Sequence, residues 1–91
     1  MTTLSKNVII QNKLGLHARA ATKLAKLSMQ YQADVTVTVG EKSADAGAIM
    51  GLMLLSGAQG KTANITASGD DAKPALTAIC QLIEDKFDED E

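Results

Sequence analysis

The chain has 91 residues, which is enough for one domain with one hydrophobic core. Apolar residues make up 45% of it and the formal charge is −2, so that a disordered segment and a general nucleic-acid binder are both disfavoured. Only Tyr31 and Phe87 are aromatic, which argues further against a platform for stacking bases.

Cys80 is the single cysteine, so no intrachain disulfide can form and a reducing compartment is favoured. We interpret it as a small buried residue of a helix. The apolar run at residues 8–10 is too short for a signal peptide or a membrane span. We therefore expect a cytoplasmic protein that does not enter the membrane.

Charge is distributed unevenly along the chain. Up to Ala33 there is no acidic residue, whereas the tail from Glu84 onward is strongly acidic. The basic first third favours an anionic ligand or an acidic partner surface, although ordinary solvated lysines would give the same pattern. We expect the last residues, 86–91, to be a frayed and solvated end.

A β-prone run at residues 7–11 comes first, with Val8 and Ile10 on one face, and predicts a strand. A turn over residues 12–15 follows. From Ala18 onward the apolar residues recur at steps of three and four, which indicates an amphipathic helix. The residues of its apolar face are Ala20, Leu24, Leu27 and Tyr31.

Residues 34–39 alternate valine and threonine, a pattern typical of a half-buried strand. Gly40 and Glu41 form a tight turn, which leads to a partner strand over residues 42–46. The stretch 47–57 is apolar on nearly every side and bounded by glycines, so we interpret it as a short helix. Residues 61–69 alternate again and predict a fourth strand.

The last helix begins at Asp70 and Asp71 and accepts Pro74, because the first turn of a helix donates no internal N–H bonds. Its buried residues are expected to be Leu76, Ile79, Cys80, Ile83 and Phe87. The order βαββαβα predicts an α+β fold in which a four-stranded antiparallel sheet is covered on one face by three helices. We expect residues 1–91 to form this single domain.

His17 is the single histidine and lies where the turn gives way to the helix. Gly15, two residues earlier, permits a close approach of the backbone. The first turn of the helix offers free N–H groups and a partial positive charge, which suit a phosphate, and Arg19 adds a planar set of donors. We predict a phosphoryl site at His17 and Arg19, with the backbone of Ala18 and Arg19 as further donors.

The predicted chemistry is nucleophilic. A histidine ring is in part neutral near pH 7 and then carries a lone pair that can attack a phosphoryl donor without a metal, a cofactor or a general base. The first-turn amides would stabilise the product by about 0.3–1 kcal/mol. Arg19 would add roughly 1.5–3 kcal/mol. Such modest stabilisation suits a carrier that must release the group again.

Other roles for His17 remain open at this point. A histidine at a helix start can serve as an N-cap that accepts from a first-turn N–H, and taken alone this is the commoner role. A zinc site is disfavoured, because there is no second histidine and Cys80 is remote. A Ser/His/Asp triad is not excluded by composition, but no nucleophile-elbow motif accompanies the histidine.

The apolar run AIMGLMLL, residues 48–55, is a second candidate site. Core packing is the default for such a run, yet a short helix cannot bury every side. We expect exposed side chains among Ile49, Met50, Met53 and Leu54. An exposed surface rich in methionine adapts well to protein partners.

The stretch LGLHARAA, followed by the βαββαβα order, resembles the HPr family of phosphocarrier proteins in the phosphoenolpyruvate-dependent phosphotransferase system. The resemblance covers almost the whole chain and implies an open-faced β-sandwich. It implies that enzyme I phosphorylates His17 on Nδ1, that the group passes to an enzyme IIA, and that Arg19 steadies it. It also implies a cytoplasmic, monomeric carrier rather than a turnover enzyme.

Three details refine this resemblance. The family commonly has proline after the motif arginine, whereas Ala20 stands here and loosens the helix start. Ala48 stands where many members carry a regulatory serine, so regulation by a serine kinase there is not expected. LHARAA and the ending FDEDE resemble the nitrogen-related branch, which implies an enzyme I and an enzyme IIA of that branch. A sugar-transport HPr is the alternative.

The resemblance places the docking face on the two helices that flank His17. Its residues would be Arg19, Ala20, Ala21, Lys23 and Lys26 from the first helix, and Ile49, Met50, Met53 and Leu54 from the second. Lys26 would meet acidic groups of the partner. A rival hypothesis is a regulatory module that docks through residues 48–55 and uses His17 only as a cap. A small-anion-binding domain is a third, weaker hypothesis.

Overall fold

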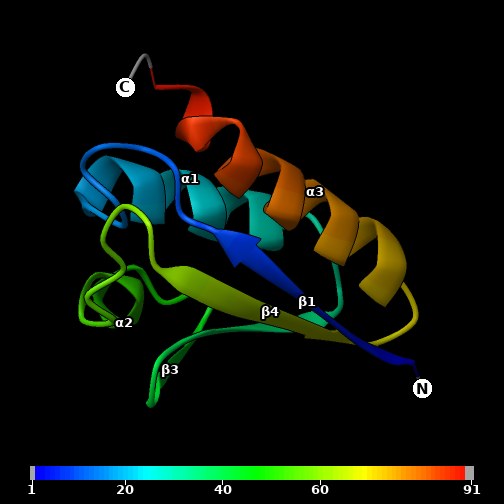
Figure 1. Ribbon diagram of the computed structural model, residues 1–91. Coiled ribbons are helices and arrows are strands. Elements are labelled where there is room, and N and C mark those ends of the chain that lie inside the picture. Colours follow the sequence, from blue (N-terminus) through cyan, green and yellow to red (C-terminus); the bar gives the residue numbers. More distant parts are fainter. Residues whose placement is uncertain (1, 90–91) are drawn as a thin grey trace.

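Strands and helices follow one another in the predicted order in the computed structural model, which describes residues 2–89 (Figure 1). The α-helices are α1 (Ala18–Ser28), α2 (Ile49–Met53) and α3 (Ala72–Glu84), and a 3₁₀ turn, η1 (Lys86–Asp88), comes last. The strands are β1 (Thr3–Ile9), β2 (Asp34–Val39), β3 (Lys42–Asp45) and β4 (Thr62–Ser68). No helix within residues 2–89 is both long enough and apolar enough to span a membrane.

The four strands form one antiparallel sheet in the order β1-β4-β2-β3. The long helices α1 and α3 lie side by side over one face of this sheet, and α2 lies beside its β3 edge (Figure 1). Alternate residues of the two central strands are buried against the helices. These are Val35, Val37, Val39, Ala63, Ile65 and Ala67. The predicted open-faced α+β architecture is therefore confirmed.

The first strand lies further toward the N-terminus than predicted. We expected residues 7–11, but β1 begins at Thr3 because it pairs with β4 along its whole length, from Thr3 opposite Ser68 to Ile9 opposite Thr62. Its polar side chains bond to the neighbouring strand, since the Asn64 amide donates to Ser5 at 3.0 Å and to Asn7 at 2.9 Å. Strand pairing overrides the weak local signal of this polar segment.

Helix α2 is shorter than the predicted stretch 47–57. It begins at Ile49 and ends at Met53, with Leu54 as its C-cap. Ser56 then adopts a positive φ of 58°, which a continuing helix cannot accommodate. The chain turns there toward β4, and Leu52 and Leu55 are the residues of this segment that reach the core.

Residues 86–89 of the C-terminal tail pack against the rest of the molecule. The expectation of a frayed, solvated end is therefore wrong for these four residues. Phe87 is fully buried, as predicted, but it lies in η1 beyond the end of α3. Burial of this large side chain offsets the left-handed φ values of 58°, 55° and 62° at Lys86, Phe87 and Asp88. Asp90 and Glu91 lie outside the described residues.

Gly15 fixes the loop that leads into α1. Its φ is +62°, and a Cβ at this position would lie 2.1 Å from the carbonyl oxygen of Gly57. The next residue, Leu16, donates its backbone N–H to the same carbonyl at 2.9 Å. The loop before α1 is thereby held against the loop before β4, with no room for a side chain between them.

We expect Gly15→Ala to destabilise the protein more than Gly40→Ala. Both glycines have φ +62°, so both substitutions incur the left-handed penalty of about 1–2 kcal/mol. Nothing lies within 4 Å of a Cβ at Gly40, whereas the clash at Gly15 should add about 1–3 kcal/mol. Urea unfolding of the two variants measures the difference, and equal losses would contradict the close approach.

Candidate functional site

His17 occupies the N-cap position of α1. Its backbone is extended, with φ −78° and ψ 179°, and its carbonyl accepts the first helical hydrogen bond from the Ala21 N–H at 2.9 Å. The imidazole makes no capping bond to the first turn. The alternative in which this ring serves only as a cap is therefore wrong.

The first turn of α1 leaves backbone donors available beside His17. The N–H groups of Ala18, Arg19 and Ala20 precede the first helical bond and have no acceptor within the helix. There is no acidic residue in this turn to occupy them, and the Arg19 side chain is exposed. The predicted phosphoryl donors thus lie at the start of one helix, next to the imidazole.

A carboxylate from the other end of the chain contacts the imidazole. His17 Nε2 is hydrogen-bonded to Glu89 Oε2, and the exposed fractions of the two side chains are 26% and 11%. Glu89 follows η1, which packs against α1, so the C-terminal tail passes close to the start of that helix (Figure 1). Sequence reasoning did not find this residue, because it treated the acidic tail as solvated.

Asn12 links the carboxylate to the loop. Its fully buried amide Nδ2 donates to the Gly15 carbonyl at 2.8 Å and to Glu89 Oε1 at 3.0 Å. The other amide atom, Oδ1, is buried without a hydrogen-bond partner. Leaving a buried polar atom unpaired costs free energy. The two hydrogen bonds of Nδ2 offset this cost and explain why an asparagine occupies this buried position.

The pKa of the Glu89 carboxyl is lowered from its ordinary value of 4.5. Desolvation acts in the opposite direction, but the hydrogen bonds from Asn12 and His17, together with the charges of His17 and Arg19, outweigh it. Glu89 therefore remains a carboxylate well into the acidic range. By contrast, burial raises the pKa of the Cys80 thiol, which is the small buried helix residue that we predicted.

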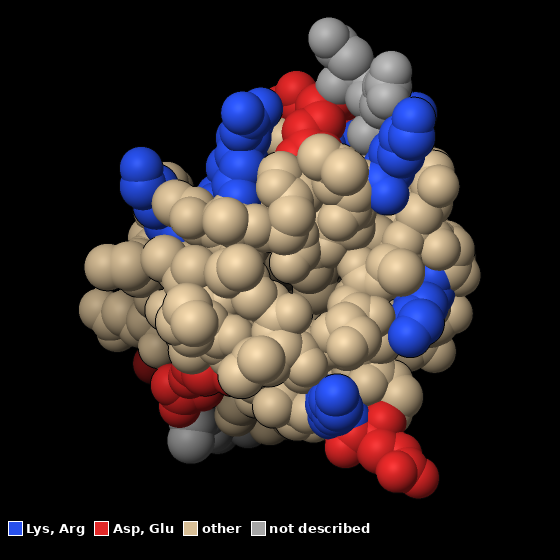
Figure 2. All heavy atoms as spheres, turned by 90° about the vertical axis from the view of Figure 1, so that its left-hand side faces the viewer, with Lys and Arg blue, Asp and Glu red and all other residues tan. Residues whose placement is uncertain are grey.

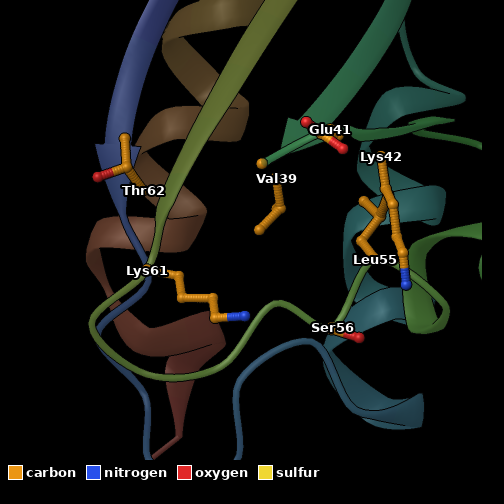
Figure 3. A pocket seen from close by; sticks show the side chains of 8 residues that line it. Val39, Glu41, Lys42, Leu55, Ser56, Lys61 and Thr62 are labelled. Carbon is orange, nitrogen blue, oxygen red and sulfur yellow. The ribbon is translucent and has the colours of Figure 1, made fainter.

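Two hollows lie near the end of α2. The larger, of about 580 Å³, is lined by the β2–β3 turn, Leu55, Ser56 and Lys61 and does not include His17; the Lys61 side chain points into it (Figure 3). The smaller, of about 360 Å³, lies against His17 and is lined by Leu14 and Met53 among others. Proximity to the imidazole makes the smaller hollow the relevant one for the predicted chemistry.

An apolar patch adjoins His17 and its hollow. Four of its members, on α2 and its C-cap, were predicted; Leu14, which is 68% exposed, was not. The patch consists of Leu14, Ile49, Met50, Met53 and Leu54. The centre of the face that carries α2 is largely uncharged, and both basic and acidic side chains lie near its margin (Figure 2).

Three residues of the predicted docking face need correction. Ala20 and Ala21 are fully buried beneath α1, so their side chains offer no surface to a partner. Lys23 is half-buried and donates its Nζ to the Phe87 carbonyl at 2.7 Å, which engages it within the molecule. Arg19 and Lys26 remain exposed.

Sequence comparison identifies the family. Residues 4–85 match the family described as "PTS HPr component phosphorylation site". The chain belongs to the HPr family. It is 52% identical to phosphocarrier protein NPr of Shewanella violacea, over 98% of each chain. It is 38% identical to phosphocarrier protein HPr of Xylella fastidiosa strain 9a5c, over 96% of this chain and 98% of the relative. The chain is thus a phosphocarrier of the phosphotransferase system.

Solved HPr structures share the fold. HPr-C-His from Thermoanaerobacter tengcongensis superposes with a TM-score of 0.88 at 35% identity, and each chain is covered completely. HPr from Bacillus anthracis gives a TM-score of 0.86 at 31% identity, covering 91% of this chain and 99% of the other. Within residues 2–89 there is no cluster of three or more His, Cys, Asp or Glu side chains that could hold a metal ion.

We expect Glu89→Gln to lower the free energy of unfolding near neutral pH but not in strong acid. Because the folded-state pKa of Glu89 is lowered, its carboxylate stabilises the fold above pH 4.5, and this contribution is lost as the pH falls through the lower folded-state value. Urea unfolding of both proteins across this range measures the effect. Asp88→Asn, at an exposed neighbour, is the control, and a pH-independent difference would contradict the expectation.

Proposed function

We propose that His17 is the phosphoryl acceptor of this carrier. It would take a phosphoryl group from enzyme I and pass it to an enzyme IIA, so that the chain is a substrate and a donor rather than a turnover catalyst. The observation that supports this most directly is a partly exposed imidazole at the start of α1, next to a hollow and not used as a cap.

The transfer itself is an in-line displacement at phosphorus. The lone pair of an imidazole nitrogen forms the N–P bond while the bond from phosphorus to the donor's leaving atom breaks, and its electron pair stays on that atom. The first-turn amides of Ala18 and Arg19 and the Arg19 guanidinium would hold the phosphoryl oxygens. The energies involved, roughly 1.5–3 kcal/mol for a charged hydrogen bond, leave the group transferable.

We further propose that partners dock on the apolar patch. Two of its exposed residues, Leu14 and Met53, line the hollow at His17, so a partner seated on the patch would bring its reacting group toward the imidazole. Arg19 and Lys26 would meet acidic groups at the edge of the contact. We exclude four residues from the docking surface. Ala20, Ala21 and Phe87 are buried, and Lys23 bonds to the Phe87 carbonyl, so these residues contribute to the stability of the fold.

The nitrogen-related branch is the proposed setting. It is supported by the 52% identity to an NPr over nearly the full length, compared with 38% for the HPr of Xylella fastidiosa. The partners would then be the enzyme I and enzyme IIA of that branch. A sugar-transport HPr is the alternative. We also propose that residues 1–91 are one domain that works as a cytoplasmic monomer.

We expect His17→Ala to abolish acid-labile phosphorylation by enzyme I and phosphoenolpyruvate, because the chain has no second histidine. Folding should survive, since the ring is partly exposed and does not cap α1. Radiolabel transfer, with circular dichroism as a check on folding, measures both. Retained labelling in the folded variant would refute the assignment.

We expect nitrogen-branch enzyme I to phosphorylate the chain faster than sugar-branch enzyme I. The two purified enzymes, each with phosphoenolpyruvate, should be compared at equal concentration for initial rate. A sugar-branch HPr treated in parallel is the matched control, and its preference should be reversed. Faster phosphorylation by the sugar-branch enzyme would favour the sugar-transport alternative.

A further inference from the structure

We propose that Glu89 is a positioning residue for the phosphoryl transfer, which orients the His17 ring so that Nδ1 presents its lone pair. This inference rests on the proposed function of His17. It assigns a role in that reaction to the C-terminal tail, a segment that lies beyond residues 4–85 of the family match.

The hydrogen bond between the two side chains determines which ring nitrogen is nucleophilic. The contact joins Nε2 of His17 to Oε2 of Glu89, and an ionised carboxylate can only accept hydrogen bonds. The hydrogen must therefore be on Nε2, which leaves the lone pair of the neutral ring on Nδ1. The pKa of Glu89 is lowered, which favours the ionised form of this acceptor.

The tail holds Glu89 in place at the expense of backbone strain. Three successive residues, Lys86, Phe87 and Asp88, adopt left-handed φ values that side chains rarely accept. Burial of Phe87, the bond from Lys23 Nζ to its carbonyl at 2.7 Å and the bond from the Glu89 N–H to the Lys86 carbonyl at 3.0 Å secure this turn. Strain that the surroundings maintain is common at functional sites.

Asn12 fixes the second carboxylate oxygen. Its buried Nδ2 donates to Glu89 Oε1 at 3.0 Å, so the carboxylate lies between the loop before α1 and the imidazole. The arrangement resembles a nucleophile or base that is oriented by a third group. The groups that face Glu89 are Asn12 and His17, with the positive charge of Arg19 nearby.

The Glu89 carboxylate would also stabilise the positive charge that the His17 ring gains during the transfer. When Nδ1 forms its bond to phosphorus, the proton on Nε2 stays in place and the ring becomes a phospho-imidazolium. The leaving atom of the donor retains the electron pair of the broken bond. Glu89 then faces a positively charged ring, and an ion pair of this kind stabilises the charge that develops during attack.

The test compares Glu89→Gln, Glu89→Ala and Glu89→Asp with the unchanged chain of 91 residues. The matched control is Asp88→Asn, which removes the same charge from an exposed neighbour. Initial rates of phosphorylation by enzyme I, over a range of carrier concentrations, give kcat and KM. We expect kcat to fall about tenfold for Glu89→Gln, more for Glu89→Ala, and less for Glu89→Asp, with KM nearly unchanged.

Ring NMR provides a readout that a purely structural role would not change. In the unchanged protein, the ¹⁵N signals of neutral His17 should show the proton on Nε2. In Glu89→Ala they should show exchange between the two tautomers. Asp88→Asn should match the unchanged protein in kcat and in tautomer.

Several results would overturn the proposal. An unchanged kcat in Glu89→Ala removes the role of Glu89, and a faster kcat would identify the tail as an inhibitory cover instead. A slower kcat with an unchanged ring tautomer also overturns it, because the effect would not act through the orientation of the ring. If the unchanged protein itself is not labelled on His17, the proposed function fails, and this outcome is separate from the others.

Discussion

The close approach of two backbone loops is the constraint on which the site depends. A Cβ on Gly15 would meet the Gly57 carbonyl at 2.1 Å, and the Leu16 N–H donates to that carbonyl at 2.9 Å. Helix α1 begins three residues after Gly15, so the position of His17 follows from this contact. Bonds between Ile10 and the Lys61 and Gly60 backbone, at 2.9 and 2.8 Å, continue the same seam.

This seam also relates the imidazole to the apolar patch. Gly57 lies just after α2, so one contact positions both the start of α1 and the end of the segment that carries Met53 and Leu54. The hollow against His17 is lined by residues from both sides of the seam. Under the proposed function, a partner docked on the patch would meet the His17 ring across this hollow.

Alanine at position 20 is compatible with a regular start of α1. The family's usual proline would fit the first turn, where no internal N–H bond is required. With alanine at this position, the helix still begins at Ala18, and the Ala21 N–H donates to the His17 carbonyl at 2.9 Å. The Ala20 side chain is fully buried. Packing of α1 against α2 and α3 stabilises the helix, so its start does not depend on a proline in the first turn.

Local patterns in the sequence were sufficient for much of this protein. The valine and threonine alternation of β2, the helical spacing after Ala18 and the apolar run of α2 each depend on neighbours within a few residues, and these elements were predicted correctly in type and order. The place of His17 and Arg19 at the start of a helix, and the exposure of most of the apolar patch, were predicted in the same way, since a helix start and a short apolar helix are local features.

Tertiary structure alone decided what lies across from His17. The contact with Glu89 joins residues 72 positions apart, and Asn12 bonds to the same carboxylate across 77 positions. The acidic run at the C-terminus does not show, from the sequence alone, which distant residues its side chains will contact. Phe87 was the one local hint, because a large apolar side chain predicted to be buried must draw the residues next to it toward the core. Burial of Phe87 is one of the interactions that offset the strain of the turn that carries Glu89 to the imidazole.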